Sequence, residues 1–427
     1  MNGTRVALVV LVLGAGTAAH GAAIDEQAHL GVASCATGVC HGKVAPQPDR
    51  NVWLNEYRIW SSDDRHARAY QTLLSPESKR IAEKLGLPSA QTAKICLDCH
   101  ADNVAADKRG PKFQLTDGIG CEACHGGAAL WVQSHAEEGA THQDNLAKGM
   151  YATEDPVARA ELCLSCHLGT SDKFATHEIM GAGHPRLSFE LEAFTANQPA
   201  HYEVDDDYVA RKGRIPGFNL WLTGQLEAAE LYLRLLKSNL YERPGVFPEI
   251  AFYDCHSCHH AMDDIRWNTR RAAQGIKPGS MRLQDHHLLT LVAATKVLEP
   301  AEAARLTQSV GRLVKGGQTG VAEARRAADV LLQWLDARRR AWTSATYDTA
   351  RVRAVRRSLV QLAADGTLSD FAAAEQVFLG VESLSLYLGD ADKIRRSLDA
   401  LYESVKDDQA FRPGRFVATA RDVLKVL

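Results

Sequence analysis

Five pairs of cysteines, each followed directly by a histidine, constrain this chain more than any other feature of its sequence. They are Cys35/Cys40–His41, Cys96/Cys99–His100, Cys121/Cys124–His125, Cys163/Cys166–His167 and Cys255/Cys258–His259, and they account for all 10 cysteines. Two closely spaced thiols before a histidine are the attachment signature of a c-type haem: the thiols bind the ring covalently and the imidazole binds the iron. The sequence therefore predicts five covalently attached haems c, with these fifteen residues as the attachment sites.

Two other chemistries use paired cysteines. Exported proteins often hold their cysteines as disulfides, and Cys-x-x-Cys pairs also bind zinc. Histidine fills 17 of 427 positions, so five chance placements directly after five cysteine pairs have a probability on the order of 10⁻⁷. Haem attachment explains that regularity, and the histidine after every pair together with the export signal argues against zinc. The first site differs because four residues separate its cysteines, and Gly38 gives this longer spacer the freedom to bulge outward.

The first 23 residues have the pattern of an export signal. Arg5 supplies a positive charge, residues 6–14 are apolar, and small residues at 19–23 offer a cleavage site. A single membrane anchor is the alternative, although the apolar run is short for a helix that spans a bilayer. We expect a soluble, periplasmic or otherwise exported protein, with a mobile lead-in over residues 24–34.

The charge pattern argues against a nucleic-acid partner. Net charge is −3 and charged residues make up 24% of the chain, and its short Lys/Arg clusters are not interleaved with aromatic residues. Arg338–Arg340 and the arginines between positions 351 and 357 could form a docking face for an acidic partner. A solvated basic helix surface is the simpler interpretation.

Apolar residues at helical spacing predict a mainly α fold with little regular sheet. Ser75 and Pro76 suit the start of a helix that stops near Gly86, and residues 218–237 form a long apolar stretch typical of a buried helix. Beyond residue 266 cysteine is absent and helical periodicity continues to the end. We predict a signal peptide over 1–23, a pentahaem cytochrome c domain over 24–265 and an α-helical C-terminal domain over 266–427.

The second axial ligand of each iron decides what its haem can do. Iron with two protein ligands transfers electrons, whereas five-coordinate iron leaves a position open for a substrate. Eleven histidines outside the motifs could supply second ligands: His29, His66, His135, His142, His177, His184, His201, His256, His260, His286 and His287. Met150 and Met180 are weaker candidates, with core packing as the simpler role.

Four of these histidines are candidates from their position beside the fourth and fifth motifs. His177 and His184 follow the fourth motif, and His286 lies on the segment that returns after the fifth. His260 directly follows His259, so it cannot bind the same iron from the opposite face. It could reach a neighbouring haem or lie exposed. His286 or His287 could then supply the second axial ligand of the fifth haem.

Residues 60–167 resemble the cytochrome c-554 family of multihaem cytochromes. The resemblance rests on Trp60 with the later run His66-Ala-Arg-Ala, on Gly118-Ile-Gly-Cys-Glu-Ala-Cys-His-Gly, and on a histidine ten positions beyond His125. It implies that His135 binds the first iron opposite His41 and that His66 binds the third iron opposite His125. In tetrahaem members the second haem lacks a distal protein ligand, which would leave an open position at His100.

Two later segments look like larger members of the same superfamily. They are the stretch from His177 to Leu191 and the run from Phe252 to His260. The chain departs from the tetrahaem pattern in its fifth motif, in the spacer of its first motif and in its long helical C-terminal region.

Two functions fit these features. The first is a periplasmic electron carrier with mostly bis-histidine haems, which exchanges electrons with other redox proteins or with a membrane quinol-linked complex. The alternative is a multihaem oxidoreductase that acts on a small nitrogen or sulfur compound at one five-coordinate haem. Against it, no motif ends in lysine, the substitution that marks the pentahaem nitrite reductases. A docking subunit for a membrane quinol enzyme is compatible with either, and no catalytic residue is assigned.

Overall fold

The computed structural model describes residues 24, 26–47, 52–242, 247–260, 276 and 280–427, so the expected signal peptide lies outside the described residues. The fold is mainly helical, as predicted. Within the described ranges there is no β-strand, and pairing is limited to two isolated bridges, His29 with Arg109 and Tyr253 with Leu283. None of the helices described is both long and apolar enough to cross a membrane.

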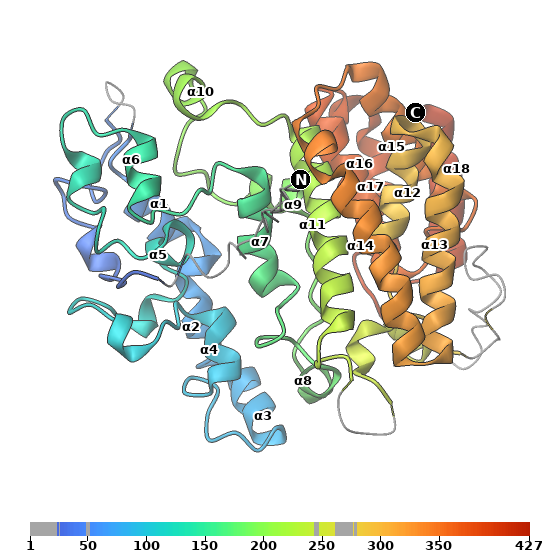
Figure 1. Cartoon of the computed structure of the whole chain (residues 1–427), viewed down its shortest axis with the longest axis horizontal. Helices are drawn as coiled ribbons and strands as arrows, with labels where there is room; N and C mark the ends of the chain where they lie inside the picture. Colours follow the sequence, from blue (N-terminus) through green and yellow to red (C-terminus); the bar gives the residue numbers. More distant parts are fainter. Residues whose placement is uncertain (1–23, 25, 48–51, 243–246, 261–275, 277–279) are drawn as a thin grey trace, which may run out of the picture.

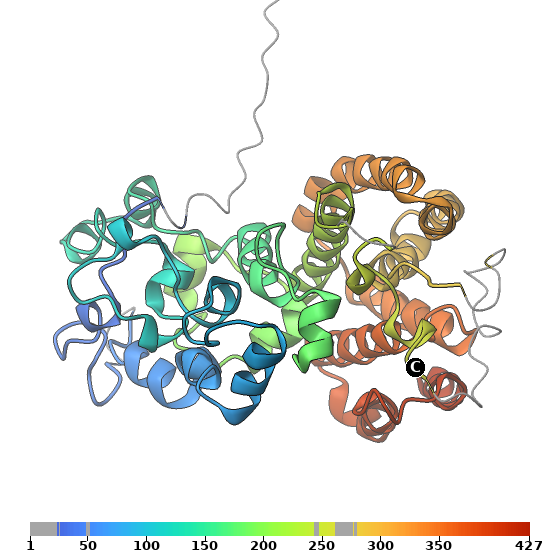
Figure 2. The ribbon, with the colours of Figure 1, turned by 90° about the horizontal axis from the view of Figure 1, so that it is seen from below.

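The molecule has two parts that lie side by side (Figures 1 and 2). The N-terminal part consists of short helices joined by long loops. Its α-helices are α1 (Glu56–Asp63), α2 (Ala69–Thr72), α3 (Pro76–Lys84), α4 (Lys94–His100), α5 (Cys121–His125), α6 (His142–Ala147), α7 (Pro156–His167), α8 (His177–Ala182), α9 (Leu191–Asn197) and α10 (Asp206–Lys212). As predicted, Ser75 caps α3, Pro76 is its first residue, and Gly86 follows its end with φ +66°.

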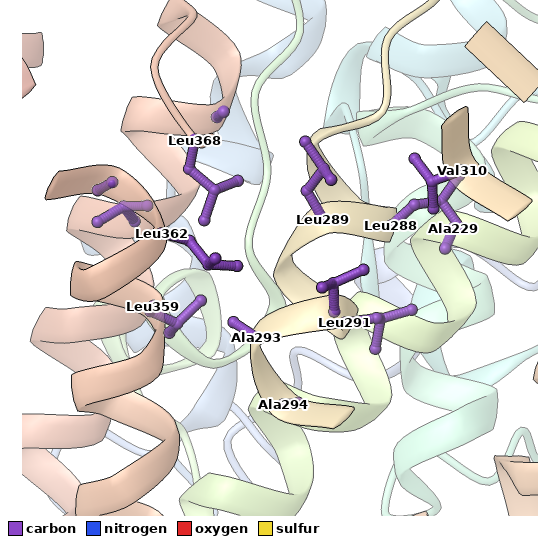
Figure 3. Packing of buried hydrophobic residues seen from close by; sticks show 14 of the residues in the cluster. Ala229, Leu288, Leu289, Leu291, Ala293, Ala294, Val310, Leu359, Leu362 and Leu368 are labelled. Atoms are coloured by element: carbon purple, nitrogen blue, oxygen red, sulfur yellow. The ribbon is translucent and has the colours of Figure 1, made fainter. Parts of the chain in front are cut away.

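The C-terminal part is a bundle of long helices. They are α11 (Gly217–Lys237), α12 (His286–Leu298), α13 (Pro300–Thr319), α14 (Val321–Ser344), α15 (Thr349–Ala364), α16 (Phe371–Tyr387), α17 (Arg395–Val405) and α18 (Pro413–Val426). Helix α11 matches the long buried helix predicted over residues 218–237. In the bundle core, Leu288 and Leu291 of α12 lie between Ala229 of α11 and Leu359 of α15 (Figure 3).

The two parts differ in how much apolar surface they bury. One continuous cluster fills the bundle and includes Phe252 and Tyr253, just before the fifth motif. The cluster around α3 and α4 consists of only Leu73, Ala82, Ala90, Leu97 and Ala101. Since burial of apolar surface is the main driving force for folding, the N-terminal part needs another source of apolar contact.

The segment before the first motif is held in place, contrary to the expected mobile lead-in. Glu122, which lies between Cys121 and Cys124, is 2% exposed. Its carboxylate accepts hydrogen bonds from the backbone N–H groups of Leu30, Gly31 and Ala128 at 2.7–2.8 Å. Residues 30 and 31 are therefore tied to the third motif, which brings the first and third motifs together.

Candidate haem sites

Four of the five motifs begin or end a short helix. Cys96 to His100 end α4, Cys121 to His125 form α5, Cys163 to His167 end α7, and Cys255 begins the 3₁₀ turn η8 (Cys255–Ser257). Residues three and four apart lie on one face of a helix, so in α4, α5 and α7 both thiols and the imidazole project to the same side. The first motif follows the 3₁₀ turn η2 (Val32–Ser34), and its spacer forms a turn closed by bonds from Cys40 and Gly42 N–H to Thr37 O.

Cys258 of the fifth motif differs from most of the other predicted attachment residues because it is exposed. Cys40 is exposed too, whereas the other eight cysteines are half-buried. The reason is local: Cys258 ends the η8 turn with φ −123° and ψ −41°, outside regular helical geometry, while Cys255 at the start of the turn is half-buried and its burial raises the pKa of its thiol. The spacing of the fifth motif gives no sign of this difference. Attachment of a haem through Cys258 stays a prediction, with the thiol at the surface of the protein.

Each motif histidine faces a second histidine from elsewhere in the chain. The distances between ring centroids fall in a narrow range, from 6.2 to 6.4 Å. Within the described residues the pairs are His41 with His135, His100 with His184, His125 with His201, His167 with His66, and His259 with His177.

This spacing is what two imidazoles need to bind one metal ion from opposite sides. A metal–imidazole bond is about 2.0–2.1 Å long. A five-membered ring with bonds near 1.35 Å has its centroid about 1.15 Å from each atom. Two such bonds and two such radii in line add up to about 6.4 Å. The geometry therefore fits a haem iron between each pair, with the adjacent thiols available for the ring.

Hydrogen bonds at Nδ1 orient five of these imidazoles. Metal-bound histidines commonly donate their other N–H to a carboxylate or carbonyl, which fixes the ring. His41 Nδ1 lies 2.9 Å from Glu56, and His66 Nδ1 lies 2.9 Å from Asp64. In three more histidines, Nδ1 lies within 2.8–3.2 Å of a backbone carbonyl oxygen. These contacts are His100 with Ala69, His135 with Trp131 and His184 with Pro185. In all five the Nε2 atom is left for the metal.

The protonation states of Asp64, His125 and His167 also suit metal binding. Burial raises the pKa of Asp64, but hydrogen bonds from His66, Gln198 and the backbone outweigh it and lower the pKa to about 2. Burial lowers the pKa of His125 to about 3 and that of His167 to about 4. Asp64 is thus ionised and these imidazoles are neutral at pH 7, and the neutral imidazole is the form that binds a metal.

The motifs lie close to one another in a definite order. The thiols of Cys35 and Cys121 interact directly, as do those of Cys99 and Cys166. The first motif is therefore the neighbour of the third, and the second is the neighbour of the fourth. Lys173 lies at the second contact, with its ammonium 3.2 Å from Cys166 Sγ and 3.4 Å from Asp98 O.

Several predicted ligands are found beside a motif histidine. His135 lies against His41, as the family resemblance implied, and both His177 and His184 face motif histidines. His100 does not face an open position, because His184 lies opposite it.

The placement of His66 corrects the expectation from the resemblance. Its ring faces His167 of the fourth motif, and the partner of His125 is His201. The backbone of His66 does lie beside the third motif, since Ile119 N–H donates to His66 O at 3.1 Å. Asp64 holds the Nδ1 atom of the His66 ring, whose partner is His167.

The fifth site also differs from the expectation for His286. His177 occupies the position opposite His259, while the ring of His286 packs against His287 with centroids 4.2 Å apart. His201, which the sequence offered only as one of eleven histidines, faces His125. No local signal marks it, because 76 residues separate it from its partner.

Other histidines have their nitrogens bonded within the protein. His29 is fully buried, with Nδ1 on Asp102 at 2.7 Å and Nε2 on Ile24 O at 3.2 Å. His142 uses Nε2 to bond Glu154. His287 is buried in the bundle with Nδ1 on Gln225 at 2.8 Å. Among the described residues, none of these three histidines pairs with a motif histidine.

Paired thiols beside facing imidazoles define a cytochrome of the c type, with haem attached covalently. Residues 34–126, which include the first three motifs and cover 93 of the 427 residues, match the family described as cytochrome c554 and c-prime. Through this segment the chain is similar to the cytochrome c-554 family, and the match supports a c-type cytochrome with covalently attached haem. No curated protein and no solved structure matches the chain.

Proposed function

We propose that this protein is an exported electron carrier with five haems c, each held between two histidines. The observation that carries the proposal is the set of five imidazole pairs at 6.2–6.4 Å, one pair for each attachment motif. A bound haem supplies a reversible one-electron couple at its iron.

The residues of the chain favour transfer over catalysis. Each pair supplies both axial ligands, so neither face of the iron is left for a substrate. Nδ1 bonds to Glu56, Asp64 and three backbone carbonyls hold the rings in place through a change of oxidation state. A ligand set that does not move keeps the structural rearrangement on electron transfer small. These features support the carrier over an oxidoreductase with one five-coordinate haem.

The contacts between the sites support a continuous route for electrons through the five haems. Motif contacts join the first site to the third and the second to the fourth. The third and fourth sites meet where Ile119, next to the third motif, bonds to the backbone of His66. The fifth site follows through α8, whose two ends lead to His177 and His184. We infer the order first, third, fourth, second, fifth.

Location and partners are part of the proposal. The N-terminal sequence pattern supports export to the periplasm, and we expect separate donor and acceptor proteins, one of which could be a membrane quinol-linked complex. The arginine clusters give little support for an acidic partner. Arg338 is paired with Glu299 and Glu302, Arg339 with Glu227 and Glu230, and Arg356 with Asp390.

Electron paramagnetic resonance of the oxidised protein tests the proposal. Ferric haems with two imidazoles are low-spin, so the expected spectrum contains low-spin signals alone. A high-spin signal that integrates to about one iron in five, and that changes on addition of nitrite, hydroxylamine or sulfite, would instead establish the oxidoreductase.

Haem quantification against protein mass tests the number of sites and should give five haems per chain. A count of four haems per chain would show that one of the motifs does not bind haem. The two to examine are the first, with its long spacer, and the fifth, with its exposed Cys258. Mass spectrometry of proteolytic peptides shows which cysteine pair lacks a haem.

A further inference from the structure

The two ligands of the fifth site come from different parts of the molecule. His259 follows a segment anchored in the bundle core by Phe252, and Arg282 binds the Asp254 carboxylate at 3.1 Å just before the motif. His177 is the first residue of α8, which packs against α3 in the N-terminal part. Something must hold these two parts in register, because a metal site tolerates displacements of only about 0.5 Å.

Phe174 stacks on Phe252 with ring centroids 5.4 Å apart, and Glu249 adds a polar connection next to His177 with one atom. Its side chain is buried, with 7% exposed. Its Oε1 accepts a hydrogen bond from the backbone N–H of His177 at 2.8 Å and another from Ala251 N–H at 3.1 Å. The backbone N–H of Glu249 donates to Tyr241 O at 3.0 Å, which fixes the residue to the end of α11. The same oxygen thus binds the residue that carries the distal imidazole and the turn that leads into Cys255.

We propose that Glu249 is the positioning residue of the fifth haem, and that its charge sets the reduction potential of that haem. The inference rests on the proposed bis-histidine ligation. The bond to His177 N–H holds the imidazole opposite His259, where the ring centroids are 6.2 Å apart. A carboxylate in a buried setting also stabilises the more positive ferric state, which lowers the reduction potential.

The effect should stay within the fifth site. Helix α8 continues toward His184 of the second site, seven residues on, or about 10 Å along a helix. That end of α8 is held separately, because Lys84 Nζ donates to Ala182 O at 3.1 Å and His184 Nδ1 lies 2.8 Å from Pro185 O. Loss of the Glu249 contact therefore releases His177 while the second site keeps its own supports.

Two variants of Glu249 in the full-length haem-loaded protein separate its two roles. Glu249→Ala removes the acceptor, and about one-fifth of the haem should become high-spin and bind carbon monoxide. Glu249→Gln retains Oε1 as an acceptor for both N–H groups but removes the charge. It should stay fully low-spin, while spectropotentiometry shows one haem with a raised potential and four unchanged.

Epistasis with the ligands identifies the site. His177→Ala with Glu249→Ala should give the same high-spin fraction as His177→Ala alone, whereas His184→Ala with Glu249→Ala should give twice that fraction. Wild-type spectra and potentials in both Glu249 variants would overturn the inference, as would additive high-spin fractions with His177→Ala. If His177→Ala alone leaves every haem low-spin, the bis-histidine proposal for this site fails, which is a separate result.

Discussion

At the scale of single residues, five of the ten histidines in the facing pairs have a hydrogen bond at Nδ1. Glu56, Asp64 and three backbone carbonyls engage Nδ1, so that Nε2 is the nitrogen left for a metal. His142 has the reverse arrangement, with Nε2 on Glu154. A bond at Nε2 therefore counts against a metal ligand, whereas a bond at Nδ1 is not sufficient for one, because His287 has its Nδ1 on Gln225 inside the bundle.

A matched pair of histidine variants tests this distinction. His201→Ala removes the imidazole opposite His125, so about one haem in five should become high-spin and bind carbon monoxide. His142→Ala deletes a histidine already bonded to Glu154 and should leave every haem low-spin. Carbon monoxide difference spectra and electron paramagnetic resonance measure both outcomes. A response from His142→Ala but not from His201→Ala would reverse the assignment.

The sequence predicts the attachment residues far better than their partners. Each attachment motif is recognised from the spacing of its cysteines and histidine. The start of α3 at Ser75, its end near Gly86 and the helix at 218–237 also follow from local rules. The distal histidines obey no local rule, because their pairing depends on how segments 76 to 101 residues apart pack together. His66 illustrates the difficulty: its backbone lies beside one motif while its ring faces another.

At the scale of elements, α11 joins the two parts of the molecule. It packs against α7 and α9 and also against α12, α14 and α16, and Figure 1 shows it at the edge of the bundle that faces α7. Close approach requires small residues: a Cβ at Gly224 would lie 2.5 Å from Leu191 Cβ on α9. The junction therefore depends on a glycine inside a helix.

Two glycine substitutions should change stability in opposite directions. Gly224→Ala forces α9 and α11 apart, and we expect a loss of about 1–3 kcal/mol. Gly311→Ala places its methyl group in open space on α13, so the higher helix propensity of alanine should add about 0.5–1 kcal/mol. Denaturant unfolding followed by circular dichroism measures both. Equal effects from the two substitutions would show that the contact with Leu191 does not limit the packing.

Glu227 on α11 should make stability depend on pH. Burial raises its pKa to about 7, although Arg339 lies 3.1 Å away and opposes the shift. A carboxyl with a raised folded-state pKa gives stability that is complete below its ordinary pKa of 4.5 and is lost as pH rises to about 7. Glu227→Gln avoids this loss, so the variant should gain about 1–3 kcal/mol relative to wild type between pH 4 and pH 8. A pH-independent difference between the two proteins would contradict the raised pKa.

At the scale of the whole molecule, the two parts have different sources of stability. The bundle has a large apolar core of its own, whereas the cluster around α3 and α4 is small and rich in alanine. Haem rings attached at the motifs would supply the missing apolar surface. Only the bundle should therefore be able to fold without them.

Expression without haem attachment tests this difference. With all ten cysteines replaced by serine, the N-terminal part should become sensitive to proteases, while a fragment that contains α11 to α18 resists them. Mass spectrometry of a limited digest identifies the protected region. Equal protection of both parts would show that the N-terminal fold does not depend on its haems.

The pairing of distant histidines also has a consequence for the way the chain folds. Each iron bound by a pair closes a loop, from 76 residues between His125 and His201 to 101 residues between His66 and His167. Closing a loop of about 100 residues with a cross-link restricts the unfolded chain by about 4.7 kcal/mol in the chain-entropy model. The first four loops all overlap, so none can close fully inside another. Coordination bonds would act here as reversible cross-links. If all ten cysteines bind haem, iron would supply the restraint on the unfolded chain that disulfides supply in many exported proteins.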